Sequence, residues 1–155
     1  MRVYTIGHST RSMREFLDIA RGHGLQLIVD IRKFPTSKKF PHFDKESIES
    51  SLLSEGIHYL HYPELGGYRS GGYVAFMQTE EFKVALERLL NLIREQKAVL
   101  MCAEAYYGRC HRRFVSDELL ERGVEVVHIH DLQRTEEHSF IPRNQLKVFC
   151  DKKAE

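Results

Sequence analysis

The chain alternates between short apolar runs and longer segments in which apolar residues recur every three or four positions. Runs that are apolar at consecutive positions are typical of strands covered on both faces of a sheet. Amphipathic helices between such strands indicate parallel pairing through right-handed crossovers. We therefore predict an α/β fold with a doubly wound, mostly parallel sheet of about five strands and helices on both faces. The predicted strands are residues 2–6, 27–31, 57–62, 98–101 and 124–129.

Helix-capping residues and glycines set the expected limits of the helices. Ser9 or Thr10 is expected to cap the first helix, which ends before Gly22. Asp44 and Thr79 are the expected caps of the next two. No helix or strand is predicted for the glycine-rich connection 63–72, and it is not expected to contribute to a core. The later predicted helices are residues 45–54, 79–96 and 109–122, and residues 145–149 could form a short helix or an edge strand.

Length, charge and cysteine content narrow the class of protein. A chain of 155 residues is expected to form one domain, residues 1–155, in which 131–155 are a weakly patterned C-terminal extension. The formal net charge of +1 argues neither for nor against a polyanionic partner. The sequence has no secretory signal and no apolar run near the ~20 residues that span a bilayer. With three cysteines, an odd number, this favours a cytoplasmic protein with reduced thiols and no membrane association.

Polar residues follow each of the five predicted strands, and those after the fifth are His130 and Asp131. Parallel strands joined by right-handed crossovers end at one edge of the sheet, and ligands bind in open α/β sheets at that edge. The alternative is that such residues simply build strand-to-helix loops. The residues expected at this edge are His8, Ser9, Asp30, Arg32, Glu64, Gly66, Gly67, Cys102, Glu104, Cys110, His111 and Arg112.

Cys102 ends the fourth apolar run and precedes a helix whose first turn is rich in cations. A helix N-terminus and nearby cations lower the pKa of a cysteine, which makes a thiolate nucleophile. The alternative is packing, because free cysteine is among the most buried residue types. Cysteine-dependent phosphatases and sulfurtransferases share this layout, but six residues separate Cys102 from Arg109 here, one more than the phosphatase pattern. We therefore do not assign that class.

The same residues allow two other kinds of site. Cysteine, histidine and carboxylate side chains suit zinc, although their spacing here matches no standard zinc pattern. Cys102 and Cys110 could form a redox pair if their Cα atoms lie within about 7 Å.

A separate feature is the loop 32–43, in which basic residues alternate with aromatic ones, as in grooves for single-stranded nucleic acid. We predict no metal ion and no other cofactor, and we favour a loop whose phenylalanines enter the core.

Several short motifs occur together and in a fixed order. They are Gly7-His8-Ser9, Val29-Asp30-Ile31-Arg32, Glu64-Leu65-Gly66-Gly67, Met77-Gln78-Thr79, Met101-Cys102-Ala103-Glu104 and Cys110-His111-Arg112. In this combination the sequence resembles the domain-of-unknown-function 488 family over roughly its first 130 residues. The resemblance implies a compact prokaryotic α/β domain whose motif residues gather in one cleft. It implies no activity.

These observations predict a small enzyme that acts on an anionic small molecule or a phosphorylated substrate. Cys102 is the expected nucleophile or redox thiol, and His8 or His111 the expected general acid or base. Asp30 or Glu104 is expected to orient that histidine. Arg32 and Arg112 are expected to bind the anion, with Ser9, Glu64, Gly66 and Gly67 completing the substrate site and Cys110 in a redox or structural role. The alternatives are a module that binds nucleic acid or protein, and a metal-binding protein that uses the same cysteines, histidines and glutamate.

Overall fold

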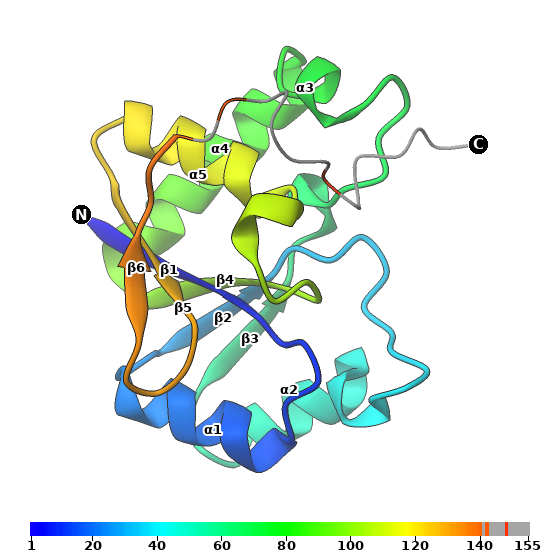
Figure 1. Cartoon of the computed structure of the whole chain (residues 1–155), viewed down its shortest axis with the longest axis vertical. Helices are drawn as coiled ribbons and strands as arrows, with labels where there is room; N and C mark the ends of the chain where they lie inside the picture. Colours follow the sequence, from blue (N-terminus) through cyan, green and yellow to red (C-terminus); the bar gives the residue numbers. More distant parts are fainter. Residues whose placement is uncertain (141, 143–147, 149–155) are drawn as a thin grey trace.

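One β-sheet forms the centre of the structure, and helices cover both of its faces (Figure 1). The computed structural model describes residues 1–140, 142 and 148. In this part of the chain the sheet has six strands in the order β3-β2-β4-β1-β5-β6. The predicted α/β class is confirmed, with one strand more than the expected five. The strands are β1 (Arg2–Gly7), β2 (Leu27–Asp30), β3 (His58–His61), β4 (Ala98–Cys102), β5 (Glu125–Ile129) and β6 (Thr135–Glu137).

Strands β1 to β5 pair in parallel, whereas β6 pairs with β5 in the antiparallel direction. Every residue of β2 and β4 is buried, which explains why their sequences are apolar at consecutive positions. Strand β4 lies between β1 and β2, and the register places Gly7 beside Cys102 and Asp30 beside Met101. The ends of the three strands therefore meet at one place on the carboxyl edge of the sheet.

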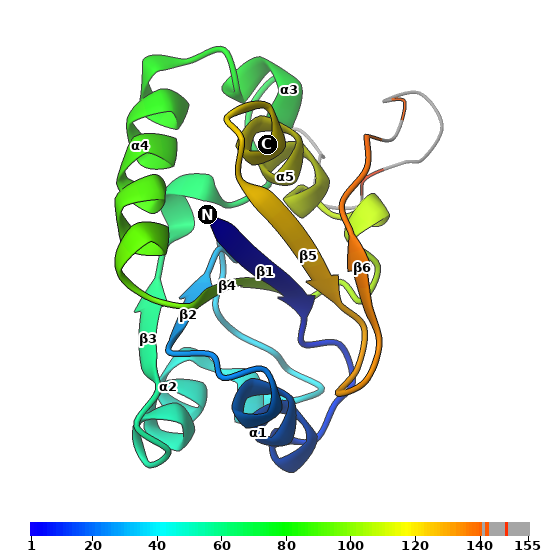
Figure 2. The ribbon, with the colours of Figure 1, turned by 90° about the vertical axis from the view of Figure 1, so that its left-hand side faces the viewer.

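The helices divide into two layers, one on each face of the sheet (Figure 2). One apolar cluster includes side chains of α1 (Met13–Gly22) and α2 (Lys45–Leu53). The other includes side chains of α3 (Tyr73–Phe76), α4 (Glu80–Glu95) and α5 (Arg112–Glu121). Three short 3-10 helices, η1 (Pro41–Phe43), η2 (Pro63–Leu65) and η3 (Tyr107–Arg109), lie in the loops. Within the described residues, no helix combines the length and apolar character needed to cross a membrane.

The helix caps differ in part from the prediction. Thr79 caps α4 as predicted, since its side chain accepts a hydrogen bond from the backbone N–H of Phe82. The prediction for α1 is wrong: Ser12, rather than Ser9 or Thr10, forms a reciprocal capping box with Glu15. Asp44 occupies the N-cap position of α2, but its carboxylate accepts the N–H of Ser37 at 2.6 Å and so fixes the preceding loop.

Two segments without predicted structure contribute to the fold. Leu65 and Tyr73, within and just after the glycine-rich connection, are fully buried, and the connection contains η2 and leads directly into α3. The prediction that it contributes no core was therefore wrong. The C-terminal extension supplies β6, which was not predicted because Thr135–Glu137 contains no apolar residue. The prediction for residues 145–149 falls, except for residue 148, outside the described part of the chain.

Candidate functional site

The loop that follows β4 passes directly over the end of β1. The backbone N–H of His8 donates to the carbonyl of Cys102 at 2.8 Å, and that of Ser9 to the carbonyl of Ala103 at 3.0 Å. A Cβ atom on Gly7 would lie 1.7 Å from the carbonyl oxygen of Glu104. Only glycine fits this approach, because the clashing atom belongs to the backbone and has no rotamer to change.

A cavity of about 390 Å³ opens at this edge of the sheet. The loop after β2 contributes three side chains to its wall, and the segment from the end of β4 to the start of α5 contributes most of the others. Five predicted site residues therefore meet here, one from the loop after β2 and four from the segment 102–111. They are Arg32, Cys102, Glu104, Cys110 and His111.

The two cysteines of the cavity are in direct contact. Their Sγ atoms lie 2.8 Å apart, and both residues are buried, free thiols. The Cys102 thiol also points toward the carbonyl oxygen of Glu104 at 3.8 Å, which can accept its hydrogen. Burial raises the pKa of Cys102 well above its usual value. As a neutral thiol, Cys102 can donate its hydrogen either to this carbonyl or to the sulfur of Cys110.

Cys110 has a backbone N–H and an imidazole nitrogen beside its sulfur. Its Sγ lies 3.4 Å from the backbone N–H of Arg112, in the first turn of α5, and 3.5 Å from Nδ1 of His111. With the thiol of Cys102, this gives three possible hydrogen-bond donors around one sulfur. Donors at a helix N-terminus stabilise a thiolate. Three groups that can donate therefore surround the sulfur of Cys110.

His111 has its tautomer fixed by the sheet. Its Nε2 lies 3.3 Å from the carbonyl oxygen of Ile31, which can only accept, so Nε2 carries a hydrogen and Nδ1 faces the sulfur. Burial lowers the pKa of His111, but the adjacent Cys110 and Cys102 outweigh it, and the pKa is raised above its usual value. The geometry therefore suits an imidazolium paired with a thiolate.

A second polar group borders the cavity at the end of β2. Arg32 forms a buried ion pair with Asp30, with Nη2 2.7 Å from Oδ2 and Nε 2.9 Å from Oδ1. The hydroxyl of Tyr59 donates to the same carboxylate. The remaining nitrogen of Arg32, Nη1, lies 3.4 Å from Nε2 of His8. Asp30 thus orients an arginine, and not a histidine, at the wall of the cavity.

His8 is held as a neutral ring. Its Nδ1 lies 3.0 Å from the carbonyl oxygen of Ser9, so Nδ1 carries the hydrogen and Nε2 is left to accept from Arg32. The ring stacks on Phe43, with centroids 4.3 Å apart. Burial is the main cause that lowers the pKa of His8 to about 4. His8 borders a second hollow of about 560 Å³, next to Ser9, Lys38 and Lys39.

Arg112 is fully buried beneath the cysteine loop. It donates from Nη1 to the hydroxyl of Thr5 at 3.0 Å and from Nη2 to the carbonyl oxygen of Glu104 at 2.7 Å. Its side chain does not border the cavity. Its positive charge lowers the pKa of Cys102, although burial raises that pKa by more. Arg112 therefore holds the loop between the two cysteines through hydrogen bonds, and its positive charge acts on the sulfur of Cys102.

The glycine-rich connection does not bring its predicted site residues to the cavity. Glu64, Gly66 and Gly67 are absent from its wall. Gly66 packs against the backbone of Lys33, where a Cβ atom would come within 3.0 Å. The carbonyl oxygen of Glu64 accepts a hydrogen bond from Arg69. These residues fix the course of two loops that lie against each other.

Other residues on the wall were not predicted as site residues. Phe34 and Tyr68 are exposed and lie near each other, with ring centroids 5.9 Å apart. Tyr68 has a φ of 58°, which is uncommon outside glycine and recurs at functional sites. Phe43, by contrast, is fully buried, so the aromatic residues of the loop 32–43 are divided between core and surface. The added wall residues are Phe34, Thr36, Tyr68, Ala103 and Arg109.

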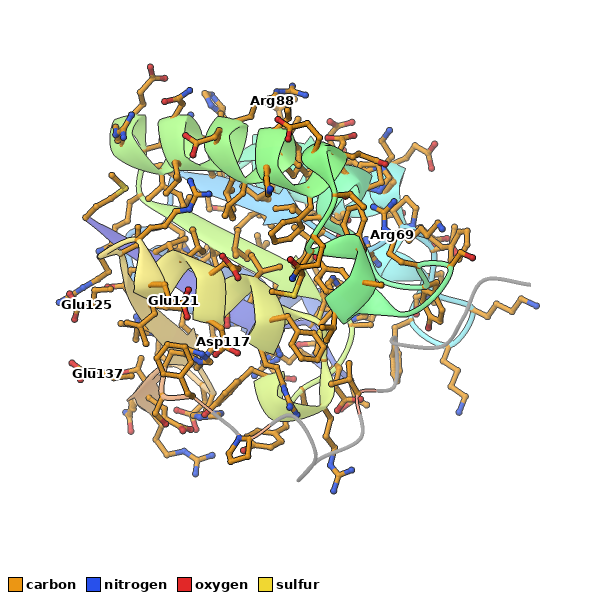
Figure 3. All side chains as sticks on the ribbon, turned by 90° about the horizontal axis from the view of Figure 1, so that it is seen from above. Arg69, Arg88, Asp117, Glu121, Glu125 and Glu137 are labelled. Carbon is orange, nitrogen blue, oxygen red and sulfur yellow. The ribbon has the colours of Figure 1, made fainter. Side chains whose placement is uncertain are left out.

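A buried chain of hydrogen bonds leads away from Arg112 and was not foreseen. The guanidinium can only donate, so the hydroxyl of Thr5 accepts from it, and this hydroxyl lies 2.5 Å from Nδ1 of His128. Nε2 of His128 then donates to Nδ1 of His138 at 2.8 Å, and Nε2 of His138 donates to Asp117 at 2.7 Å. Figure 3 labels Asp117 on α5. Every link is satisfied with both histidines neutral, and burial, as the largest cause, lowers the pKa of His128 to about 2.

The predicted alternative of a zinc site gains no support from the arrangement. Across residues 1–140, 142 and 148, no three histidine, cysteine or acidic side chains are placed to hold one metal ion. His111 and Cys110 face each other, and Nε2 of His111 is turned to a backbone carbonyl. The sulfur and nitrogen atoms that would bind zinc are therefore in hydrogen-bond contact with other groups of the site.

Comparison with known proteins gives one match. A protein-family model described as "Domain of unknown function DUF488" matches residues 12–72 and 70–119. These ranges cover more than half of the chain and contain every residue on the wall of the cavity. His8, His128 and His138 lie outside them. The searches of curated proteins and of solved structures found no match.

Proposed function

The chain belongs to the family described as domain of unknown function DUF488, and we propose that it is a small enzyme that acts on an anionic substrate through the thiol of Cys110. One observation carries the proposal: the sulfur of Cys110 has three potential hydrogen-bond donors and lies on the wall of a cavity large enough for a small molecule. Proximity of a thiol, an imidazole and a helix N-terminus is the usual means of activating a cysteine.

Cys110, and not the sequence-predicted Cys102, is the attacking residue in this proposal. The carbonyl oxygen of Glu104 can accept the hydrogen of Cys102, and burial raises the pKa of this thiol, so both favour its protonated form. The neighbours of Cys110 donate, so they stabilise its thiolate. His111 shares a proton with this sulfur and supplies it to the leaving group after attack. Its contact with Ile31 keeps Nδ1 turned toward the reaction.

Charged residues on the wall favour an anion. Arg32 and Arg109 provide guanidinium groups, which bind carboxylate, sulfonate and phosphate oxygens with good geometry. Glu104 is the acidic residue on this wall, and it opposes the binding of an anion. The buried ion pair with Asp30 fixes the orientation of Arg32 before the substrate arrives. A site with free thiols functions in a reducing compartment, so we place the protein in the cytoplasm.

Alkylation with reagents of different charge tests the proposal. Cys150 is replaced (Cys150→Ser) so that Cys102 and Cys110 are the remaining thiols. Iodoacetate and iodoacetamide are compared on native protein and on protein unfolded in urea, and peptide mass spectrometry locates the label. We expect Cys110 to react first. Folding is expected to raise the rate with iodoacetate relative to iodoacetamide by about tenfold, as one charge-assisted hydrogen bond of ~1.5 kcal/mol gives.

Two single substitutions on the wall of the cavity give opposite expectations. Arg109→Gln removes a cation and is expected to reduce the preference for iodoacetate. Glu104→Gln removes an acidic group and is expected to increase it. Preferential labelling of Cys102, or the same reagent preference in native and unfolded protein, would overturn the proposal.

A further inference from the structure

We propose that Cys102 is the second thiol of a dithiol pair and that the site reduces small anionic disulfides by thiol–disulfide exchange. This inference rests on the proposed function, because Cys110 is the attacking thiol in both. It adds a role for Cys102 and a class of substrate. The observation behind it is the contact between the two sulfurs, which lie 2.8 Å apart in a shared cavity.

The distance between the sulfurs leaves little movement for bond formation. The sulfur atoms of a disulfide lie about 2.05 Å apart, so the two thiols need to approach by only about 0.8 Å. Cys102 ends β4 and Cys110 follows η3, and the short loop between them returns the chain to the same place. A pair held this closely competes well with any external thiol for a mixed disulfide formed on one of its members.

The different surroundings of the two sulfurs assign an order to the reaction. Cys110, the sulfur surrounded by donors, attacks first as a thiolate and forms a mixed disulfide with one half of the substrate. The other half leaves as a thiolate and takes the proton from His111. Cys102, which had donated a hydrogen bond to the thiolate of Cys110 and kept its proton, now lies beside a disulfide sulfur that can be attacked.

The second step closes the internal disulfide. Neutral His111 accepts the proton of Cys102, whose thiolate then attacks the sulfur of Cys110 and expels the second half of the substrate. That half takes up the same proton from His111. One substrate disulfide thus becomes two thiols, and the two protein thiols become one disulfide. Two hydrogens and two electrons pass from protein to substrate, and a cellular thiol reductant reverses the change to complete the cycle.

The wall of the cavity selects the charge of the disulfide. Arg32 and Arg109 favour carboxylate groups near the sulfurs. Phe34 and Tyr68, both exposed at the cavity, supply apolar surface for the short carbon chains between carboxylate and sulfur. A small disulfide with an acidic group on each half meets these conditions. A small disulfide with an amine on each half does not meet these conditions.

Three disulfides of similar size and different charge test the inference. Dithiodipropionate carries two negative charges, cystamine two positive charges and hydroxyethyl disulfide none. Each is added in equimolar amount to reduced Cys150→Ser protein, and the released thiol and the intact mass are followed. We expect dithiodipropionate to release two thiols per chain and to leave protein lighter by two hydrogens. Its rate is expected to exceed that of cystamine by about tenfold or more.

Variants of the cysteines separate the two steps. Cys102→Ser is expected to stop at a mixed disulfide on Cys110, with one thiol released and the protein heavier by one half of the reagent. Cys102→Ala, which needs no hydrogen-bond partner, is expected to trap the same adduct. Cys110→Ser is expected to lose the rapid reaction. Circular dichroism of each variant establishes that it is folded.

The outcomes distinguish this inference from the proposed function. If Cys110 is alkylated with the expected preference for an anion, but dithiodipropionate yields no internal disulfide in Cys150→Ser protein, the dithiol role is wrong and the proposed function stands. If cystamine reacts as fast as dithiodipropionate, the substrate class is wrong. If Cys110 shows neither the alkylation nor the exchange, both proposals fail.

Discussion

Arg32 and Asp30 lie two positions apart and form a buried ion pair in which two nitrogens of the guanidinium contact one carboxylate. Tyr59 donates to the same carboxylate, and the backbone N–H of Arg32 adds a further hydrogen bond at 3.1 Å. Asp30 ends β2, and Arg32 is part of the wall of the cavity. An arginine fixed in this way meets a substrate without losing side-chain freedom.

Asp30→Asn is expected to lower the free energy of unfolding by about 3 kcal/mol, because it leaves a buried guanidinium without its counter-charge. Urea unfolding measures the loss. Asp30→Leu combined with Arg32→Met is the matched control, since removing both charges leaves neither unpaired, and it is expected to cost less. A loss below about 1 kcal/mol for Asp30→Asn would show that water compensates the arginine.

Acid is expected to destabilise the protein as the pH falls below about 6.5. The pKa is lowered to about 4 for His8 and about 2 for His128, mainly by burial, whereas an unfolded histidine has a pKa of about 6.5. The unfolded state therefore binds more protons in this range, and each histidine is expected to remove about 2 kcal/mol between pH 7 and pH 5. His111 has a raised pKa, so its contribution is lost only as the pH rises above about 6.5.

Urea midpoints at pH 7 and pH 5 measure this loss. His8→Asn is the control, because it removes one of the two titrating groups and is expected to reduce the difference between the two pH values. Equal stability of the native protein at both pH values would show that water reaches these histidines.

Gly7→Ala is expected to lower the free energy of unfolding by about 2 kcal/mol or more, because the added Cβ meets a backbone carbonyl. The loop of Glu104 must move, so we also expect slower alkylation of Cys110. Gly22→Ala is the control: its Cβ meets only the tip of the exposed side chain of Leu132, which can turn away. Thermal unfolding compares them, and equal melting temperatures would contradict the close approach.

Asp117→Leu is expected to cost about 1–3 kcal/mol, because it leaves Nε2 of His138 as a buried donor without an acceptor. Asp117→Asn retains an acceptor oxygen and is expected to cost less. Chemical denaturation of both variants at neutral pH gives the comparison. If leucine is tolerated as well as asparagine, the chain from Arg112 to Asp117 does not stabilise the fold.

The sequence was informative where a local pattern alone decides the structure. Strands β1 to β5 were predicted because each is a short run rich in apolar, β-branched or aromatic residues, and α4 because Thr79 precedes a regular apolar stripe. Ser12 was missed as the cap of α1 because several hydroxyl residues precede that helix and only the contact with Glu15 distinguishes them. β6 was missed because its pairing with β5 is a tertiary contact.

The sequence predicted where the candidate site lies, but not which contacts its side chains make. The carboxyl edge of the sheet brings Arg32, Cys102 and His111 together, and topology alone implies this. Which cysteine holds its proton depends on whether its neighbours donate or accept, and the course of the loop decides that. His128 lies in an apolar strand, and nothing in the sequence links it to His138. Their contact joins β5 to the residue that follows β6, and only the tertiary structure brings them together.

Strand β6 also limits what can join the sheet. It occupies the edge beside β5, which would otherwise offer a row of open backbone groups to a strand from another molecule. It is only three residues long, and Glu136 and Glu137 are exposed on it. An incoming strand would find a short template with repelling charges. Among residues 1–140, 142 and 148 the sheet ends with β6, and its shortness and charge oppose aggregation by strand addition at this edge.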